Sequence, residues 1–202
     1  TIESLGGEKG NYSIIHPNDH VNFGQSTNDV FPTTMRIAAL FLLKELFPVV
    51  DELADALNEK AVEFDGVIKS GRTHLQDAAP IKFSQEFSGY ASAVSKTLEK
   101  ARSASDALKE LGIGGTAVGT GLNTHPEYAQ KIISELEKIT GLDVRAAANC
   151  FEAMQSNAPI TEVSGAVKVL ATELIRIAND LRLLSSGPKT GLAEITLPAV
   201  RP

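Results

Sequence analysis

P-T-T-M-R-I-A-A-L-F-L-L-K-E-L-F-P-V-V-D-E-L-A-D-A-L-N-E-K-A-V-E-F occupies residues 32–64 and carries a long apolar pattern. Its apolar residues recur at steps of three and four, which is the period of an α-helix. The stripe consists of Leu43, Leu46, Val50, Leu53, Leu57 and Ala61. We therefore predict a helix over about 32–64, kinked at Pro48 because proline lacks the N–H that the helical ladder needs.

Two further stripes of the same period predict long helices over about 80–111 and 160–184. The first stripe is Phe83, Phe87, Tyr90, Val94, Leu98, Ala101 and Leu108, and the second is Ile160, Val163, Val167, Leu170, Leu174, Ala178 and Leu181. Each long helix would measure about 40–48 Å at roughly 1.5 Å per residue. No segment alternates with the period of two that a half-buried strand shows. The predicted fold class is therefore all-α, a long-helix bundle.

Shorter elements are predicted from local signals. Residues 1–8 read as the tail of a helix that ends at the glycines at 6–7. Thr124 and Glu127 form a T-x-x-E capping box that would open a shorter helix ending at Gly141, and a short helix is predicted at 148–156. Several apolar residues lie off the stripes, and helices of other subunits are predicted to cover them. These residues are Ile37, Leu40, Phe41, Ile175 and Ile177.

A polar stretch, H-P-N-D-H-V-N-F-G-Q-S-T-N-D at residues 16–29, precedes the first long helix. Asn28 or Asp29 could accept hydrogen bonds from the first free N–H groups of that helix, and Pro32 would suit its first turn. The stretch is either a helix cap behind a polar loop or an anion site at the positive end of the helix. It is longer than a cap requires, so we favour the anion site.

Composition excludes several classes of partner. The formal net charge is −6 and no block of Lys and Arg occurs, so nucleic acid and anionic membrane are poor partners. No apolar run is long enough to span a bilayer, and the N-terminus does not resemble a signal peptide. Cys150 is the only cysteine, which excludes an internal disulfide and fits a reducing, cytoplasmic location. Both ends look cut.

Residues 66–80, G-V-I-K-S-G-R-T-H-L-Q-D-A-A-P, are predicted to be a loop with a second polar cluster. His74 is the best titratable candidate because imidazole changes charge near neutral pH. The alternative is a loop histidine bonded to Asp77. A third irregular segment, G-I-G-G-T-A-V-G-T-G-L-N at 112–123, is a close-approach loop, and it is neither a P-loop nor a dinucleotide fingerprint.

Antiparallel long helices would place the two polar clusters, at 26–28 and 72–74, far apart in one chain. An antiparallel partner subunit could bring them together, so the geometry favours a site shared between subunits. No pair of residues has the spacing of a metal site, and no metal ligand is predicted.

Four ordered motifs together resemble the fumarase/aspartase superfamily. They are the polar stretch at 16–29, G-R-T-H-L-Q-D-A-A-P at 71–80, G-G-T-A-V-G-T-G-L-N at 114–123 and N-D-L-R-L-L-S-S-G-P-K-T-G-L-A-E-I at 179–195. The resemblance covers essentially the whole chain. It implies a homotetramer whose long helices form a central helical core, and an enzyme that reversibly adds water or an amine across fumarate. Nothing in the sequence requires a metal or an organic cofactor.

The resemblance also assigns roles to individual residues. It implies that Ser26, Thr27 and Asn28 contact the carboxylates of a small dicarboxylate substrate. Thr73 and His74 would be the catalytic residues that this chain supplies, and they would contact the substrate bound by another subunit. A secondary dicarboxylate site near the entrance is implied at His16, Asn18 and Asp19.

Within the superfamily, S-T-N-D, L-Q-D-A and L-S-S-G-P-K-T-G-L look more like aspartate ammonia-lyases. Fumarases more often read S-S-N-D, L-M-D-A and A-S-G-P-R-C-G-L. We therefore predict reversible elimination of ammonia from L-aspartate to give fumarate. The alternatives are fumarate hydratase and, from another class, a non-catalytic helical assembly protein.

The family's mobile loop, G-S-S-x-M-P-x-K-x-N, carries the serine base and should begin just after Pro202. We therefore predict that residues 1–202 are the central helical-bundle domain of a longer enzyme. Residues 1 to about 25 would be the tail of an N-terminal domain, the C-terminal domain and mobile loop would be absent, and the piece would be inactive alone.

Overall fold

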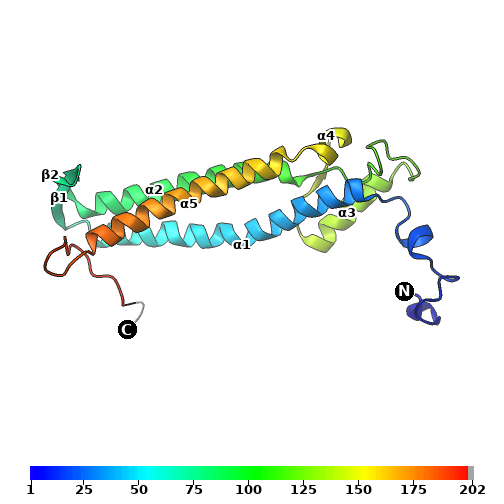
Figure 1. Cartoon of the computed structure of the whole chain (residues 1–202), viewed down its shortest axis with the longest axis horizontal. Helices are drawn as coiled ribbons and strands as arrows, with labels where there is room; N and C mark the ends of the chain where they lie inside the picture. Colours follow the sequence, from blue (N-terminus) through cyan, green and yellow to red (C-terminus); the bar gives the residue numbers. More distant parts are fainter. Residues whose placement is uncertain (200–202) are drawn as a thin grey trace. The chain divides into compact units, whose positions relative to one another are not determined.

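A computed structural model describes residues 1–199 of the chain and shows a mostly helical protein (Figure 1). The predicted all-α class is thus confirmed, with the addition of two small pairs of strands. The helices are α1 (Thr27–Glu63), α2 (Phe83–Ser105), α3 (Tyr128–Thr140), α4 (Cys150–Gln155) and α5 (Ala158–Leu184). The strands are β1 (Ile68–Thr73), β2 (Gln76–Lys82), β3 (Glu110–Leu111) and β4 (Arg145–Ala146).

The chain divides into two compact units, and α1 contributes to both. The first unit consists of Thr1–Leu43 and Ser105–Ile160, and the second consists of Lys44–Ala104 and Thr161–Pro202. No helix within residues 1–199 is long and apolar enough to cross a membrane.

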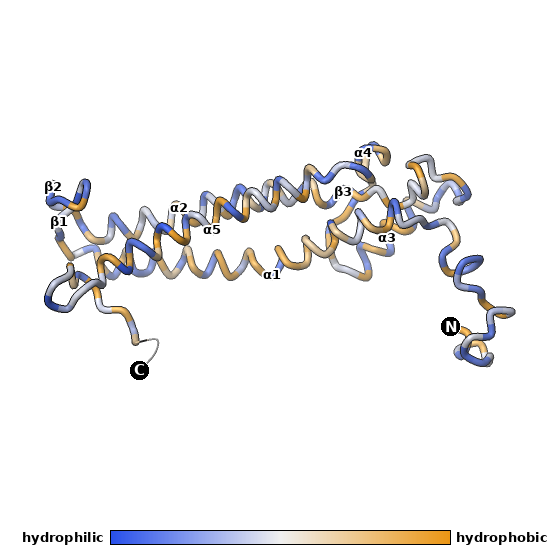
Figure 2. The backbone as a smooth tube through the Cα atoms, viewed as in Figure 1, coloured by the Kyte–Doolittle hydropathy of each residue, from blue (hydrophilic) through white to orange (hydrophobic). Residues whose placement is uncertain are grey.

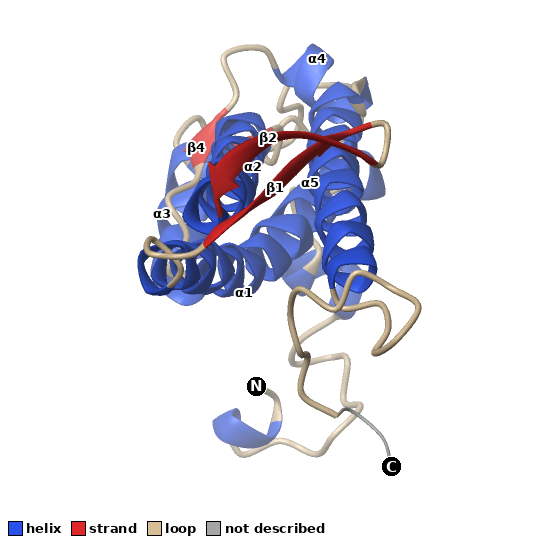
Figure 3. Cartoon of the chain, turned by 90° about the vertical axis from the view of Figure 1, so that its left-hand side faces the viewer, coloured by secondary structure: helices blue, strands red, loops and turns tan. Residues whose placement is uncertain are grey.

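The core of the second unit forms where the later part of α1, α2 and α5 lie side by side, as Figures 1 and 3 show. Every member of the predicted α2 stripe is buried, and Val94 and Ala101 are fully so. On α1, Ala54 is buried while Leu53 is 39% exposed. The small Ala54 therefore replaces the predicted Leu53 on the packed face.

Burial also corrects the prediction for the off-stripe residues. Leu40 and Ile177 are buried inside the chain itself, so they need no cover from another subunit. Phe41 and Ile175 remain 41% and 62% exposed. Figure 2 shows apolar residues recurring along α1 and α5.

The segment predicted to be a loop at 66–80 instead contains an antiparallel hairpin of β1 and β2 (Figure 3). Most of its side chains are exposed, so it lacks the alternation of apolar and polar residues that marks a half-buried strand. In its backbone ladder, Thr73 pairs with Gln76 across a two-residue turn. Both turn residues, His74 and Leu75, have positive φ, as a tight hairpin turn with the right twist requires.

The first unit is organised around the buried side chain of Arg36 on α1, which is 3% exposed. Its guanidinium donates hydrogen bonds to carbonyl oxygens of two segments that are distant in sequence. The acceptors are Ala107 before β3, Glu110 in β3, Ala153 in α4 and Ser156 just after α4. α2 ends at Ser105 rather than at the predicted residue 111, and Arg36 binds two carbonyls of the segment that follows it.

The predicted capping box at 124–127 is not formed. The Thr124 hydroxyl donates to the carbonyl of Gly121, and α3 begins at Tyr128 without a side-chain cap. The segment at 112–123, which we call the glycine-rich turn, thus binds the threonine hydroxyl that the predicted cap requires. Local sequence does not reveal this competition. Gly141 ends α3 in the left-handed conformation, as predicted.

Candidate functional site

The start of α1 is fixed by a capping box made from the S-T-N-D motif. The Ser26 hydroxyl oxygen accepts from the backbone N–H of Asn28 at 3.2 Å, and the Asp29 carboxylate accepts from the backbone N–H of Ser26 at 3.0 Å. The cap is therefore Ser26, not Asn28 or Asp29 as predicted. Because the helix starts at Thr27, Pro32 lies in its second turn rather than its first.

The same motif is bonded to the glycine-rich turn that follows β3. The second oxygen of Asp29 accepts from the backbone N–H groups of Gly114 and Thr116, each at 3.0 Å. The side-chain amide of Asn28 donates to the carbonyl of Ala117 at 2.8 Å. Gly114 has a φ of 92°, and a Cβ there would lie 2.6 Å from the Cβ of Ala129. The turn thus needs glycine to approach α3 so closely.

A cavity of about 550 Å³ lies between these elements, and all of its lining residues belong to the first unit. Thr27 and Asn28 bring polar groups into it, from the N-terminal end of α1. Its other walls come from α1, the glycine-rich turn and α4. They are Phe31, Pro32, Ala117, Val118, Phe151, Met154 and Gln155.

The polar groups of this cavity have distinct hydrogen-bonding capacity. The hydroxyl of Thr27 makes no side-chain hydrogen bond to any residue between 1 and 199 and can donate to a bound anion. The Asn28 amide donates one of its two N–H groups to Ala117, so its second N–H remains as a donor and its side-chain oxygen remains as an acceptor. The cavity therefore offers neutral donors and a neutral acceptor near the positive end of a helix.

Thr73 and His74 lie at the tip of the β1–β2 hairpin, in the second unit. Both are exposed, and the predicted alternative of a His74–Asp77 hydrogen bond is not formed. Asp77 instead accepts from the hydroxyl of Ser70 at 2.9 Å. His74 adopts a φ of 51°, which is costly for a residue with a side chain and is a feature of many functional sites.

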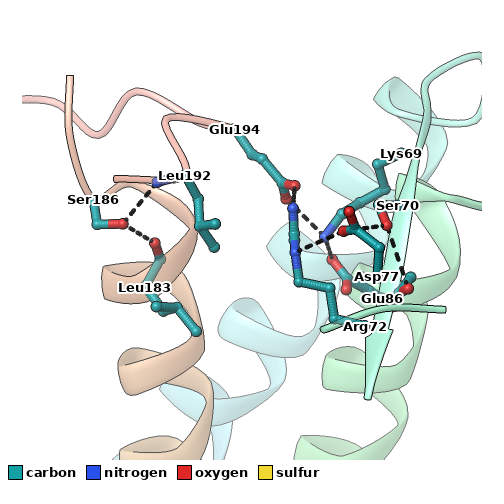
Figure 4. Close-up of polar contacts among 10 residues, drawn as sticks. Lys69, Ser70, Arg72, Asp77, Glu86, Leu183, Ser186, Leu192 and Glu194 are labelled. Atoms are coloured by element: carbon teal, nitrogen blue, oxygen red, sulfur yellow. Dashed lines mark hydrogen bonds and ion pairs between the residues drawn. The ribbon is translucent and has the colours of Figure 1, made fainter. Parts of the chain in front are cut away.

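The base of the hairpin is held by a cluster of ion pairs (Figure 4). Lys69 contacts the carboxylates of Glu86 on α2 and of Glu194, each at 2.8 Å, and its side chain is only 7% exposed. Arg72 pairs with the other oxygen of Glu194. Burial alone would raise the pKa of Glu194, but hydrogen bonds from Arg72 and Lys69 outweigh it and lower the pKa below its ordinary value. The cluster ties the hairpin to the segment after α5.

The predicted secondary-site residues form a short helical turn, Pro17–Val21, in the first unit. His16 caps it, because its Nδ1 accepts from the backbone N–H groups of Asn18 and Asp19 at 3.3 Å each. The Asp19 carboxylate lies 3.3 Å from the same nitrogen. An Nδ1 that accepts two hydrogen bonds carries no proton, so we interpret this last contact as proximity rather than an ion pair.

The structure thus groups the predicted residues by unit. Ser26, Thr27 and Asn28 lie together at the start of α1, and His16, Asn18 and Asp19 belong to the same unit, whereas Thr73 and His74 belong to the other. Two charged residues beside these positions were not predicted, Asp29 as a link to the glycine-rich turn and Glu194 as a hairpin anchor. Within residues 1–199, no group of three or more His, Cys, Asp and Glu side chains could hold a metal ion.

Comparisons with known proteins agree on the kind of protein. A family model described as Lyase matches residues 1–202. Fumarate hydratase class II from Nitrosomonas europaea is 48% identical over 201 residues, which are 99% of this chain and 44% of that protein. Aspartate ammonia-lyase from Bacillus subtilis is 46% identical over 201 residues, which are 100% of this chain and 42% of that protein.

A solved structure agrees as well. The cobalt-bound crystal structure of fumarate lyase:delta crystallin from Brucella melitensis matches with a TM-score of 0.94 at 44% identity, over 100% of this chain and 44% of that one. The matched family is a family of lyases. The chain belongs to it, as a member of the fumarase/aspartase superfamily. It spans less than half the length of these relatives.

Proposed function

We propose that the chain is the central part of a lyase that reversibly eliminates ammonia from L-aspartate to give fumarate. The observation that carries the proposal is the cavity at the start of α1, where Thr27 and Asn28 meet the glycine-rich turn. Relatives named fumarate hydratase and aspartate ammonia-lyase match at nearly equal identity. The preference for aspartate therefore rests on the motifs S-T-N-D, L-Q-D-A and L-S-S-G-P-K-T-G-L.

The chemistry suits a site with neutral donors. A proton must leave the carbon beside a carboxylate, and the negative charge then moves into that carboxylate. Preorganised donors stabilise such a charge as it develops. Ser26 and Thr27 would supply hydroxyl donors to a carboxylate. The second amide N–H of Asn28 would add a donor to the carboxylate, and its side-chain oxygen could accept from the ammonium group of aspartate.

We assign the remaining polar groups to a second subunit. The side chains of Thr73 and His74 sit on an exposed hairpin tip and make no hydrogen bond to other residues among 1–199, so they are available to a neighbouring chain. In a homotetramer they would complete the cavity of another subunit, with His74 as its titratable group. His16, Asn18 and Asp19 would form the secondary site at the entrance. We place the enzyme in the cytoplasm, because the lone Cys150 fits a reducing compartment.

Fumarate hydratase is the second candidate, supported by the relatives of that name. The acceptor on Asn28 could also bind the hydroxyl group of malate, so the cavity alone does not separate the two substrates. A non-catalytic assembly protein is a weaker candidate, because a packing scaffold has no use for an open cavity with an unpaired threonine hydroxyl.

Assays of the complete protein test the proposal. Fumarate formation would be followed by absorbance, with aspartate and with malate as separate substrates. Thr27→Val should lower the rate by roughly 10²–10³-fold, the usual loss when one donor to a developing oxyanion is removed. Thr34→Val is the matched control, because its hydroxyl bonds to the carbonyl of Val30 and does not line the cavity. Faster turnover of malate would assign a fumarase, and no turnover of either would refute the proposal.

A further inference from the structure

The carboxylate of Asp29 is the most deeply buried charge beside the candidate cavity. Its side chain is 0% exposed, yet it does not line the cavity itself. A buried carboxylate is costly unless hydrogen bonds compensate its charge. Here three backbone N–H groups do so, those of Ser26, Gly114 and Thr116, all at 3.0 Å.

These three bonds join two walls of the cavity that are about 85 residues apart in sequence. Oδ1 fixes Ser26, and through it the first turn of α1 that presents Thr27 and Asn28. Oδ2 fixes the glycine-rich turn immediately before Ala117 and Val118, which line the opposite side. The Asp29 side chain thus links the two walls from behind the cavity, in addition to the bond that the Asn28 amide donates to Ala117 within it.

The glycine-rich turn depends on this link for its shape. Thr116 has a φ of 57°, a conformation that residues with a Cβ rarely adopt, and its backbone N–H points to Asp29. The hydroxyl of Thr116 is buried and has no hydrogen-bond partner within residues 1–199. Surrounding structure must hold such a strained residue in place, and the Asp29 carboxylate is the charged group that does so.

We propose that Asp29 is a positioning residue for the lyase reaction. Without touching the substrate, it sets the distance and orientation of Thr27 and Asn28 relative to the glycine-rich turn, and so determines how well the cavity fits a dicarboxylate. This inference rests on the proposed function. A capping residue that only stabilised α1 would need the bond to Ser26 alone, whereas two of the three bonds go to the other wall.

The test uses Asp29→Asn in the complete protein. Asparagine keeps the shape, but its NH₂ group cannot accept a hydrogen bond, so at least one wall is released. We expect kcat/KM to fall by about 10²-fold, the size of loss that a misplacement of about 1 Å can cause. Ile133→Ala is the control for general stability, because Ile133 is buried in the same unit and does not line the cavity. It should lower the melting temperature and leave kcat/KM close to that of the wild type.

A double-mutant cycle with Thr27→Val separates positioning from stability. If Asp29 acts by placing Thr27, adding Asp29→Asn to Thr27→Val should cost much less in kcat/KM than Asp29→Asn costs alone. Fully additive losses, or normal kcat/KM in Asp29→Asn, would overturn the inference. An inactive wild-type protein would instead refute the proposed function, so the two failures are distinguishable.

A second measurement keeps the inference testable if Asp29→Asn does not fold. Backbone hydrogen exchange would be followed in the wild-type protein with and without succinate, a dicarboxylate that has no leaving group, at a concentration that inhibits turnover. Binding at Thr27 should slow exchange at the amides of Gly114 and Thr116, because Asp29 couples the two walls. Unchanged exchange at both amides would overturn the inference.

Discussion

At the scale of single residues, buried charges connect segments that are far apart in the sequence. Arg36 joins α1 to carbonyls near β3 and α4, and Asp29 joins α1 to the glycine-rich turn. Glu194 joins the segment after α5 to Lys69 and Arg72 on β1. In each case the partners are backbone groups or opposite charges, which is what makes burial of a charge tolerable.

Glu194→Gln should weaken the 202-residue chain and change its response to acid. The pKa of Glu194 is lowered from the ordinary value of 4.5, so its ionised form contributes stability above that pH and loses it as the pH falls through the lowered pKa. The substitution removes the carboxylate that pairs with both Lys69 and Arg72. We expect a loss of about 1.5–3 kcal/mol at neutral pH, the size typical of hydrogen bonds to charged groups.

The measurement is urea denaturation across the range from neutral to acidic pH. Stability of the variant should fall less steeply with acid than that of the wild type. Asp77→Asn is the matched control, because Asp77 is 83% exposed and lies 3.8 Å from Arg72, and an exposed pair contributes little. Parallel pH profiles for wild type and Glu194→Gln would contradict the argument.

At the scale of elements, sequence periodicity predicted the long helices well. The predicted helices at 32–64 and 160–184 are observed as Thr27–Glu63 and Ala158–Leu184. Their stripes repeat over many turns, so the helical period outweighs local signals such as Pro48, at which α1 remains helical. The ends were less predictable. α2 stops at Ser105 rather than at residue 111, and the bonds from Arg36 to the segment beyond it have no local signal in the sequence.

The β1–β2 hairpin could not be predicted from periodicity or turn chemistry. Its strands are mostly exposed, so no alternation marks them. Its turn residues are His74 and Leu75, where asparagine and glycine are the usual choices for positive φ. Because the turn contains no glycine or asparagine, the sequence carries no signal for a hairpin with His74 at its tip.

Leu75→Gly should stabilise the chain, because glycine adopts the φ of 61° at this position without a Cβ clash. The left-handed conformation costs about 1–2 kcal/mol for other residues. Part of that gain is offset by the greater freedom of glycine in the unfolded chain, so we expect a net gain of up to about 1 kcal/mol. Thermal melting measures it. Ala78→Gly on β2 should lower the melting temperature instead, and a drop for both variants would show that the turn is not strained.

At the scale of the whole molecule, the site could be predicted only in parts. The motifs predicted Ser26, Thr27 and Asn28 as site residues, and the structure places the last two in the lining of the candidate cavity. They did not reveal that Asp29 binds the glycine-rich turn, because a hydrogen bond across about 85 residues has no local signal. Thr73 and His74 belong to the other unit, so whether they reach a cavity in a second subunit depends on assembly.

The last prediction concerns that assembly. Large apolar side chains stay exposed on α1 and α5 even though other residues of both helices form the cores of the units. They include Leu42, Val49, Val62, Val169 and Ile175, with exposed fractions from 46% to 79%. Exposed apolar patches commonly mark interfaces between subunits, and we expect these side chains to belong to such interfaces.

We therefore expect the 202-residue chain to form a discrete oligomer at micromolar concentration. Light scattering should give a mass that is a multiple of 21.5 kDa. Leu42→Lys combined with Ile175→Lys should shift the equilibrium toward the monomer, because each places a charge in an apolar interface. Ser164→Lys on the exposed surface of α5 is the control and should leave the mass unchanged. A mass of 21.5 kDa at every concentration would show that these apolar side chains do not form an interface between copies of the chain.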